Sequence, residues 1–279
     1  MIWTDSVHPT FAFVRFRVFS ARPYPMKSFA VLLLSVISLL GSAFAADAAP
    51  AQAPVYELRI YYTHPGKMPD LLKRFREHTC ALFERHGMVN IGYWLPVETK
   101  DQDKLYYLLR HASRDAAKAS WKTFGEDPEW REVARASEAN GKIVAKVDST
   151  FLAATDYSPA AIPALTGSHA YELRIYTCHD GKLADLDARF RNHTTKLFER
   201  HGMTNVLYTH PTDAAKGSAT TLVYLLAHAS PEAGQKSFAA FRADPDWVKV
   251  KAESEAAGPI LAKPVESIYL TPTDFSALK

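Results

Sequence analysis

The residues best suited to chemistry occur twice, because the sequence repeats itself. An arginine stays charged at physiological pH and presents a planar fork of N–H donors to a carboxylate or enolate oxygen, and a tyrosine adds a hydroxyl donor. A glutamate two residues away can hold the arginine in place, or act as a base if burial raises its pKa. These residues are our leading candidates for binding a small anionic or carbonyl-bearing molecule. They are Glu57, Arg59, Tyr61, Glu172, Arg174 and Tyr176.

A second set combines histidines with an amide, a grouping that could serve as a general base or a metal site. The members of this set are His86, Asn90, His111, His201, Asn205 and His228. His86 falls on the apolar stripe of its helix and at the helix C-terminus, which favours a core histidine over a catalyst. The sequence has no His-Glu-x-x-His, Cys-x-x-Cys or glycine-rich phosphate motif. It therefore predicts no metal and no cofactor.

The elements that must position these residues follow from the duplication. The strand-like Tyr-Glu-Leu-Arg-Ile-Tyr occupies 56–61 and 171–176, and most positions of 56–95 are identical to those of 171–210. A repeat of this length indicates one folding unit that was duplicated and packed against itself.

Each unit reads as strand, helix, strand, strand, helix, strand. In the first unit, period-2 alternation predicts strands over 55–62, 89–95, 105–111 and 148–153, and helical spacing predicts a helix from 67 to 87. Further helices are expected after Ser113 and after Asp127. The fold class is therefore α+β, with two ferredoxin-like βαββαβ repeats over 55–158 and 169–279, joined by a linker at 159–168.

These motifs together resemble the NIPSNAP family. The residues that carry the resemblance are the Tyr-Glu-Leu-Arg-Ile-Tyr strand, the Gly-Lys turn, the helix end Phe-Glu-Arg-His-Gly-Met and the Asp-Pro-Glu-Trp helix start, in both halves. The resemblance implies a dimeric α/β barrel, here built by the two repeats of one chain as a pseudo-dimer with its helices outside. Members of the family have been linked to vesicle transport and mitochondrial quality control in animals, and bacterial members resemble cofactor-free oxygenases only through the shared superfamily.

The orientation of the first strand decides where chemistry could occur. We expect Leu58 and Ile60 to face the helices, so that Glu57, Arg59 and Tyr61 and their copies make a polar barrel lumen. Charges in a lumen are costly unless they pair or bind something. The two readings are a ligand pocket and an arginine–glutamate network that fixes the sheets.

The N-terminal region predicts export. Residues 1–45 combine a basic start at Lys27, an apolar run and an Ala-x-Ala end, which is typical of a secretory signal, and Met26 is the expected true start. Residues 46–54 read as a flexible leader. We expect a periplasmic or secreted protein with no stable membrane span after cleavage. Without the signal, the basic excess of the full chain, a net charge of +3, largely disappears, and with it the case for nucleic-acid binding.

The two cysteines, Cys80 and Cys178, are too few for a disulfide scaffold and are expected to be unpaired. A reactive Cys178 beside His179 is the alternative. Two functions remain open: a small-molecule binder or enzyme, and a non-catalytic interaction scaffold that uses its outer helices. Self-association of barrels is compatible with both.

Overall fold

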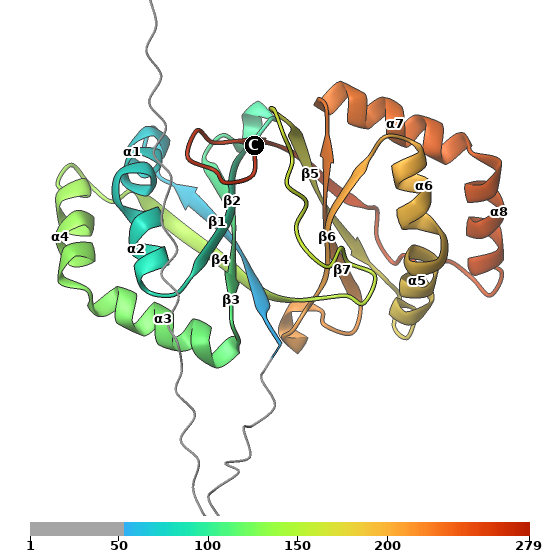
Figure 1. Ribbon diagram of the computed structural model, residues 1–279, viewed down its shortest axis with the longest axis horizontal. Coiled ribbons are helices and arrows are strands. Elements are labelled where there is room, and N and C mark those ends of the chain that lie inside the picture. Colours follow the sequence, from blue (N-terminus) through green and yellow to red (C-terminus); the bar gives the residue numbers. More distant parts are fainter. Residues whose placement is uncertain (1–52) are drawn as a thin grey trace, which may run out of the picture. The chain divides into compact units, whose positions relative to one another are not determined.

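Each repeat supplies four strands to one closed barrel, and its helices lie on the outer side of those strands (Figure 1). The computed structural model describes residues 53–279. The predicted signal peptide and most of the predicted leader lie outside this range. Within it, every helix is too short or too polar to cross a membrane.

The first repeat follows the predicted order of elements. Its elements are β1 (Val55–Thr63), α1 (Met68–Arg74), a π-helical turn (Phe75–Thr79), α2 (Cys80–Arg85), β2 (Val89–Pro96), β3 (Lys104–His111), α3 (Arg114–Glu126), α4 (Pro128–Ser137) and β4 (Val144–Ala154). The strand β4 begins four residues earlier than predicted, since its first residues pair with the end of β1 beyond a register shift after Tyr62.

The second repeat has the same order. Its elements are β5 (Ala170–Thr177), α5 (Leu183–Arg189), a π-helical turn (Phe190–Thr194), α6 (Thr195–Arg200), β6 (Thr204–Pro211), β7 (Thr221–His228), α7 (Pro231–Ala243), α8 (Pro245–Ser254) and β8 (Glu266–Pro272). Short 3₁₀ turns precede β3 and β7, at Thr99–Asp101 and Ala214–Lys216.

Local chemistry explains where the outer helices begin. The Ser113 hydroxyl accepts the Ala116 N–H at the start of α3, and the Asp127 carboxylate accepts the Glu129 and Trp130 N–H groups at the start of α4. These side chains satisfy donors that have no partner inside the helix. Pro128 at the first helical position fits the same signal.

The long first helix of each repeat contains a π-helical turn that the sequence pattern did not predict. The Thr79 hydroxyl donates to the Arg74 carbonyl at 3.1 Å, and the Thr194 hydroxyl donates to the Arg189 carbonyl at 3.1 Å. Each hydroxyl thus donates back to the carbonyl of the residue just before the turn, five positions earlier. Such turns are rare and often mark functional sites.

The barrel order is β1-β3-β2-β8-β5-β7-β6-β4, closed by the pairing of β4 with β1. All neighbouring strands are antiparallel, and the two half-sheets join through β2 with β8 and through β4 with β6. Because closure removes every free sheet edge, the two repeats complete each other as a pseudo-dimer.

The lumen is apolar, so our prediction of a polar lumen is wrong. Residues of both repeats fill it, and the cavity left between them has a volume of about 20 Å³, room for roughly one water molecule. Side chains lining it include Leu58, Leu108, Leu173 and Leu225. A narrow barrel interior has no water to solvate charges, so the aliphatic face of β1 turns inward and the charged face turns toward the helices.

Two chain segments cross from one repeat to the other. The first arm, Thr155–Ser158, follows β4 and lies on the second repeat, where the Ser158 hydroxyl accepts the Tyr208 N–H at 3.1 Å. The second arm, Thr273–Ser276, follows β8 and lies on the first repeat, where the Ser276 hydroxyl accepts the Tyr93 N–H at 3.0 Å. Each repeat therefore lends part of its chain to the core of the other.

An arginine fixes each arm. Arg191 donates two hydrogen bonds of 2.7 Å to Asp156, and Arg76 donates two of 2.6 and 2.7 Å to Asp274. The ring of Phe275 stacks on that of Phe75 with 6.4 Å between centroids. The arms are thus held by polar and apolar contacts together.

Candidate functional site

The polar residues of β1 lie between the half-sheet and α3. Glu57 is 1% exposed, and its carboxylate accepts hydrogen bonds from all four neighbouring donors. The donors are Arg59 Nη1 at 2.6 Å, Ser149 Oγ at 2.6 Å, Trp121 Nε1 at 2.7 Å and His111 Nε2 at 3.0 Å. We call these five residues together with Tyr107 the Arg59 cluster.

The carboxylate of Glu57 is held in its ionised form. Burial by itself would raise its pKa, but the hydrogen bond from His111, the charge of Arg59 and the hydrogen bonds from Ser149 and Trp121 outweigh burial and lower the pKa to about 2. An ionised carboxylate only accepts, so His111 carries its proton on Nε2. Glu57 is therefore an anchor, and the alternative role of a base with a raised pKa does not hold.

Arg59 is the reachable end of this cluster. Its Nε donates to the Tyr107 hydroxyl at 2.8 Å, and its guanidinium carbon lies 4.2 Å from the ring centroid of Trp121. About 15% of the side chain is exposed. Glu57 and Tyr107 occupy two of its five N–H groups, so the guanidinium is fixed in place and keeps donors to spare. Tyr61 lies beside it, with its ring 5.6 Å from the guanidinium carbon.

The second repeat builds the same arrangement, which we call the Arg174 cluster. Arg174 Nη1 donates to Glu172, Nε donates to Tyr224 at 2.9 Å and Nη2 donates to Tyr176 at 3.3 Å. Glu172 also accepts from His228 and Ser267. Its pKa is lowered as well, because these interactions outweigh the opposing effect of burial. The structure thus assembles all six leading candidates in two equivalent sites outside the lumen.

The two repeats take one of the hydrogen-bond donors to the buried glutamate from different elements. Phe238 takes the place of Trp121, so α7 offers no N–H to Glu172. Tyr269, in the place of Phe151, interacts with Glu172 instead, and burial together with that carboxylate raises the tyrosine pKa. Gly234 makes room, because a Cβ there would lie 2.9 Å from the Tyr269 hydroxyl. The second repeat thus loses the tryptophan beside its glutamate and gains a tyrosine in compensation.

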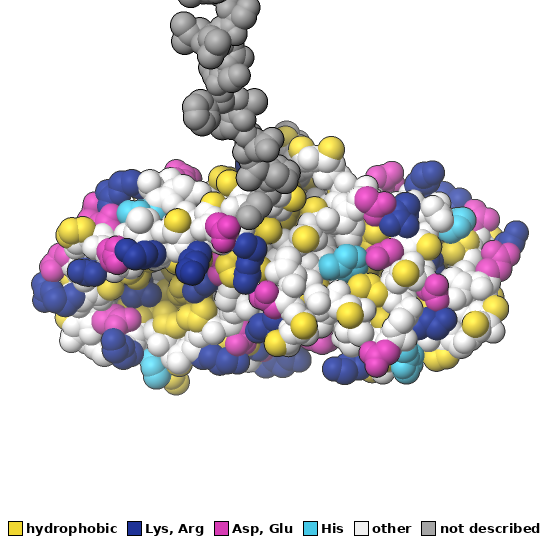
Figure 2. All heavy atoms as spheres, turned by 90° about the horizontal axis from the view of Figure 1, so that it is seen from below, with side chains coloured by type: hydrophobic (Ala, Val, Ile, Leu, Met, Phe, Trp, Pro, Cys, Tyr) yellow, Lys and Arg dark blue, Asp and Glu magenta, His cyan; other side chains and the backbone are white. Residues whose placement is uncertain are grey.

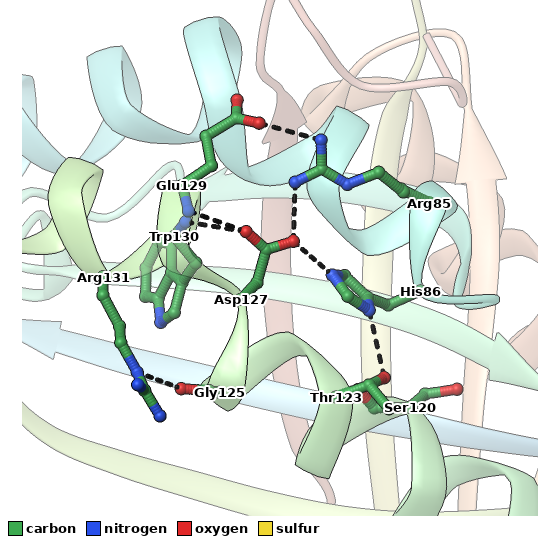
Figure 3. Close-up of polar contacts among 9 residues, drawn as sticks. All are labelled: Arg85, His86, Ser120, Thr123, Gly125, Asp127, Glu129, Trp130 and Arg131. Atoms are coloured by element: carbon green, nitrogen blue, oxygen red, sulfur yellow. Dashed lines mark hydrogen bonds and ion pairs between the residues drawn. The ribbon is translucent and has the colours of Figure 1, made fainter.

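The second set of predicted residues is dispersed over different contacts. His86 Nε2 contacts Asp127 Oδ2 at 2.7 Å and its Nδ1 contacts the Thr123 hydroxyl at 3.0 Å, as Figure 3 shows. Arg85 donates to the same Asp127 oxygen at 2.6 Å. The His86 hydrogen bond, followed by that of Arg85, holds the pKa of Asp127 well below its usual range. His86 thus joins the end of α2 to the start of α4.

This arrangement has the outline of a hydroxyl–imidazole–carboxylate relay, but its bonds are those of a structural joint. The Thr123 hydroxyl has one proton and lies within hydrogen-bond distance of both the Ser120 carbonyl, at 3.1 Å, and His86 Nδ1, at 3.0 Å. Asp127 caps α4. In the second repeat His201 contacts Asp244 at 2.7 Å, and Ala240 stands where Thr123 does. The joint is common to both repeats and the hydroxyl is not.

Asn90 and His111 belong to separate contacts. The Asn90 amide donates to the Cys80 carbonyl at 3.0 Å and to Glu84 at 2.9 Å, and it accepts from the Tyr93 hydroxyl. Asn205 repeats this pattern with Thr195, Glu199 and Tyr208, and His228 repeats the role of His111. The structure therefore does not gather the predicted histidine and amide groups into one site.

Thiol chemistry and metal binding gain no support from this geometry. Burial raises the pKa of both Cys80 and Cys178 to about 11, and neither cysteine is in a disulfide. A thiol with such a pKa is almost wholly protonated at neutral pH. Among the described residues, no three histidine, cysteine or acidic side chains lie where they could hold a metal ion together.

Several cluster residues escaped the sequence analysis. Trp121, Ser149 and Ser267 were not singled out, nor were Tyr107 and Tyr224, which are fully buried. One signal was available for the serines, because a serine recurs at the same place in the last strand of each repeat. Trp121 has no counterpart in the second repeat, so the duplication could not reveal it.

Most of the chain is similar to proteins of known structure. No curated protein matches the sequence. Among solved structures, a proposed monooxygenase of Fusobacterium nucleatum is 9% identical with a TM-score of 0.53, over 82% of this chain and 99% of that chain. An anthrone oxidase-like protein is 13% identical with a TM-score of 0.50, over 82% and 95%. A NIPSNAP family protein of Agrobacterium tumefaciens is 24% identical with a TM-score of 0.34, over 38% of this chain and 98% of that chain.

These likenesses concern the fold, and the family model adds the sequence evidence. It matches the chain twice, once over each βαββαβ repeat, and together the matches span most of the chain. The NIPSNAP model covers residues 56–159 and 171–277, and the chain belongs to the NIPSNAP family.

Proposed function

We propose that this protein is an exported binder of a small anionic or carbonyl-bearing molecule, which it holds at Arg59 and Arg174 between each half-sheet and its helices. The observation that carries the proposal is the fixed guanidinium. The fully hydrogen-bonded carboxylate of Glu57, a tyrosine hydroxyl and an aromatic ring hold Arg59. Part of its side chain stays exposed with free N–H donors. Pre-organised donors of this kind bind a planar oxygen pair with little loss of conformational freedom.

The reaction class is left open by this proposal. At 9% and 13% identity, the oxygenase and oxidase names of the similar structures concern those proteins, and the likeness extends to the fold alone. Glu57 is a poor base with its lowered pKa. Binding is therefore the part of the function that this geometry supports.

Native mass spectrometry with thermal unfolding tests the binding site. We expect protein purified from its own cells to carry a small ligand, and Arg59→Met with Arg174→Met to lose that ligand. Arg114→Met changes an exposed arginine of α3 and should keep it. If the Arg59 and Arg174 variants retain the ligand, or if the wild type carries none under any condition tried, the clusters are structural networks and the proposal fails.

Export rests on the sequence pattern of residues 27–45. N-terminal sequencing of the protein from a periplasmic extract should find a mature start near Ala46. An intact Met1 in cytosolic protein would contradict the export part and leave the binding part standing.

A further inference from the structure

Two matching grooves lie on the outer surface, one in each repeat. The first, of about 510 Å³, runs between α1 with its π-helical turn and α4, and the second, of about 450 Å³, runs between α5 and α8. These volumes are in the range of small-molecule sites. Both grooves lie on the far side of the helices from the lumen, and the Arg59 and Arg174 clusters do not line them.

A buried arginine lines each groove. Arg74 is 5% exposed and Arg189 is 4% exposed, although both carry a full charge. The guanidinium carbon of Arg74 lies 5.4 Å from the ring centroid of Trp130, and that of Arg189 lies 5.2 Å from the centroid of Trp247. A stacked ring holds the plane of the guanidinium in one orientation.

Only one end of each guanidinium is satisfied by the protein. Arg74 Nη1 donates to Ser137 at 3.3 Å and Glu138 at 3.4 Å, and Arg189 Nη1 donates to Ser254 at 3.2 Å and Glu255 at 2.9 Å. Among the described residues, the buried Nε atoms of both arginines have no hydrogen-bond partner, and no bond reaches either Nη2. Because Nε is buried, Nη2 is the guanidinium donor that remains free for a group in the groove.

Histidines lie near the buried arginine in both grooves. His78 and His193 line the two grooves, one helical turn beyond the buried arginines. Lys73 adds a second cation to the first groove. The acidic residues of that groove are Asp70, which pairs with Lys67 at 3.1 Å, Glu132, which pairs with Arg135 at 2.6 Å, and Glu77.

The duplication offers a further comparison. Five groove positions are identical in the two repeats, although these helices face outward. The shared pairs are Asp70 and Asp185, Arg74 and Arg189, His78 and His193, Val133 and Val250, and Ser137 and Ser254. The same buried arginine is therefore left half-bonded twice, in the same surroundings.

We infer that each groove binds the carboxylate group of a small organic acid, with Nη2 of Arg74 or Arg189 as its donor and the histidine at the rim. The inference is independent of the proposed ligand site at Arg59 and Arg174. It assigns the chain two further sites for one chemical class of ligand.

Fluorine NMR of 4-fluorobenzoate tests this inference on the mature protein. We expect line broadening from binding, at least about tenfold weaker affinity in the Arg74→Lys, Arg189→Lys double variant, and one remaining site in each single variant, because lysine keeps the charge and lacks the Nη2 donor. Neutral 4-fluorobenzamide should not bind, and Arg114→Lys should behave as wild type.

Substitutions at the rim and at the other arginines complete the test. His78→Gln with His193→Gln should weaken binding several-fold without altering a buried charge, which keeps the test valid if the lysine variants do not fold. Unchanged binding in the histidine or lysine double variants, equal binding of the amide, or no binding by the wild type would overturn the inference. So would loss of 4-fluorobenzoate in Arg59→Met with Arg174→Met, which would instead place that carboxylate at the proposed functional site.

Discussion

At the scale of single residues, Glu57 determines what the Arg59 cluster can do. Four donors surround its carboxylate, so the negative charge is fully used inside the protein and the arginine beside it is fixed. A buried ion pair of this kind is not in itself a large gain in stability, but removing one partner leaves an uncompensated charge. Glu57 is thus needed for the position of Arg59 whether or not Arg59 binds a ligand.

The lowered pKa of Glu57 makes stability depend on pH in a definite direction. The pKa is about 2 in the folded protein against an ordinary value of 4.5, so ionised Glu57 stabilises the fold above pH 4.5. That contribution, of about 3 kcal/mol, is lost as the pH falls from 4.5 toward 2. Urea unfolding over this range should show a shallower loss of stability for Glu57→Gln than for the wild type.

At neutral pH the same variant should be less stable by roughly 3 to 5 kcal/mol, because Arg59 then lacks its buried partner. Glu132→Gln is the control, since this exposed carboxylate pairs only with Arg135 at the surface and should change little. Identical pH profiles for Glu57→Gln and wild type would show that Glu57 does not carry this dependence.

At the scale of elements, the strands and most helices could be predicted, and the direction in which β1 faces could not. A period of two sorts Leu58 and Ile60 from Glu57, Arg59 and Tyr61 with certainty. It does not say which set meets the helices when both faces of the strand are covered. The decisive facts, a dry lumen and a helix that presents Trp121, belong to other parts of the chain.

The sequence predicted the residues of the candidate site that are duplicated and missed those whose role depends on distant elements. Duplication pointed to Glu57 and Arg59, because their copies stand at the same places in the second repeat. The π-helical turns and the half-bonded Arg74 went unnoticed, since an arginine between Leu71 and Phe75 looks like an interruption of an apolar stripe. Its role depends on α4, about sixty residues away.

The crossing arms predict an effect of one repeat on the other. Phe275 belongs to the second repeat but packs on Phe75 and Tyr93 of the first. Phe275→Ala should cost about 2 kcal/mol for a half-buried ring, and hydrogen exchange should quicken in β2 and α1 rather than in the second repeat. Val248→Ala, at an exposed position of α8, is the control. Faster exchange confined to β5–β8 would contradict the exchange of arms.

At the scale of the whole molecule, neither half is complete. One half-sheet alone would expose the edges of β2 and β4 together with an aliphatic lumen face. Such a surface drives association. Figure 2 shows one outer face of the intact molecule, where acidic and basic side chains are scattered among apolar ones.

Residues 55–158 expressed alone should therefore form a homodimer that rebuilds the barrel, or else aggregate. Analytical ultracentrifugation with urea unfolding distinguishes these outcomes from a folded monomer. A cooperatively unfolding monomer of this fragment would show that a repeat is stable without its partner, against the barrel described here.

The second arm also bears on the moment at which the chain becomes native during translation. The ribosome makes a polypeptide from its amino end, so the parts that are made first usually fold first. Here the Tyr93 N–H obtains its partner from Ser276, and Phe75 obtains its stacking ring from Phe275. The first repeat therefore cannot complete its core until the ribosome has made the chain through Ser276, 183 residues after Tyr93.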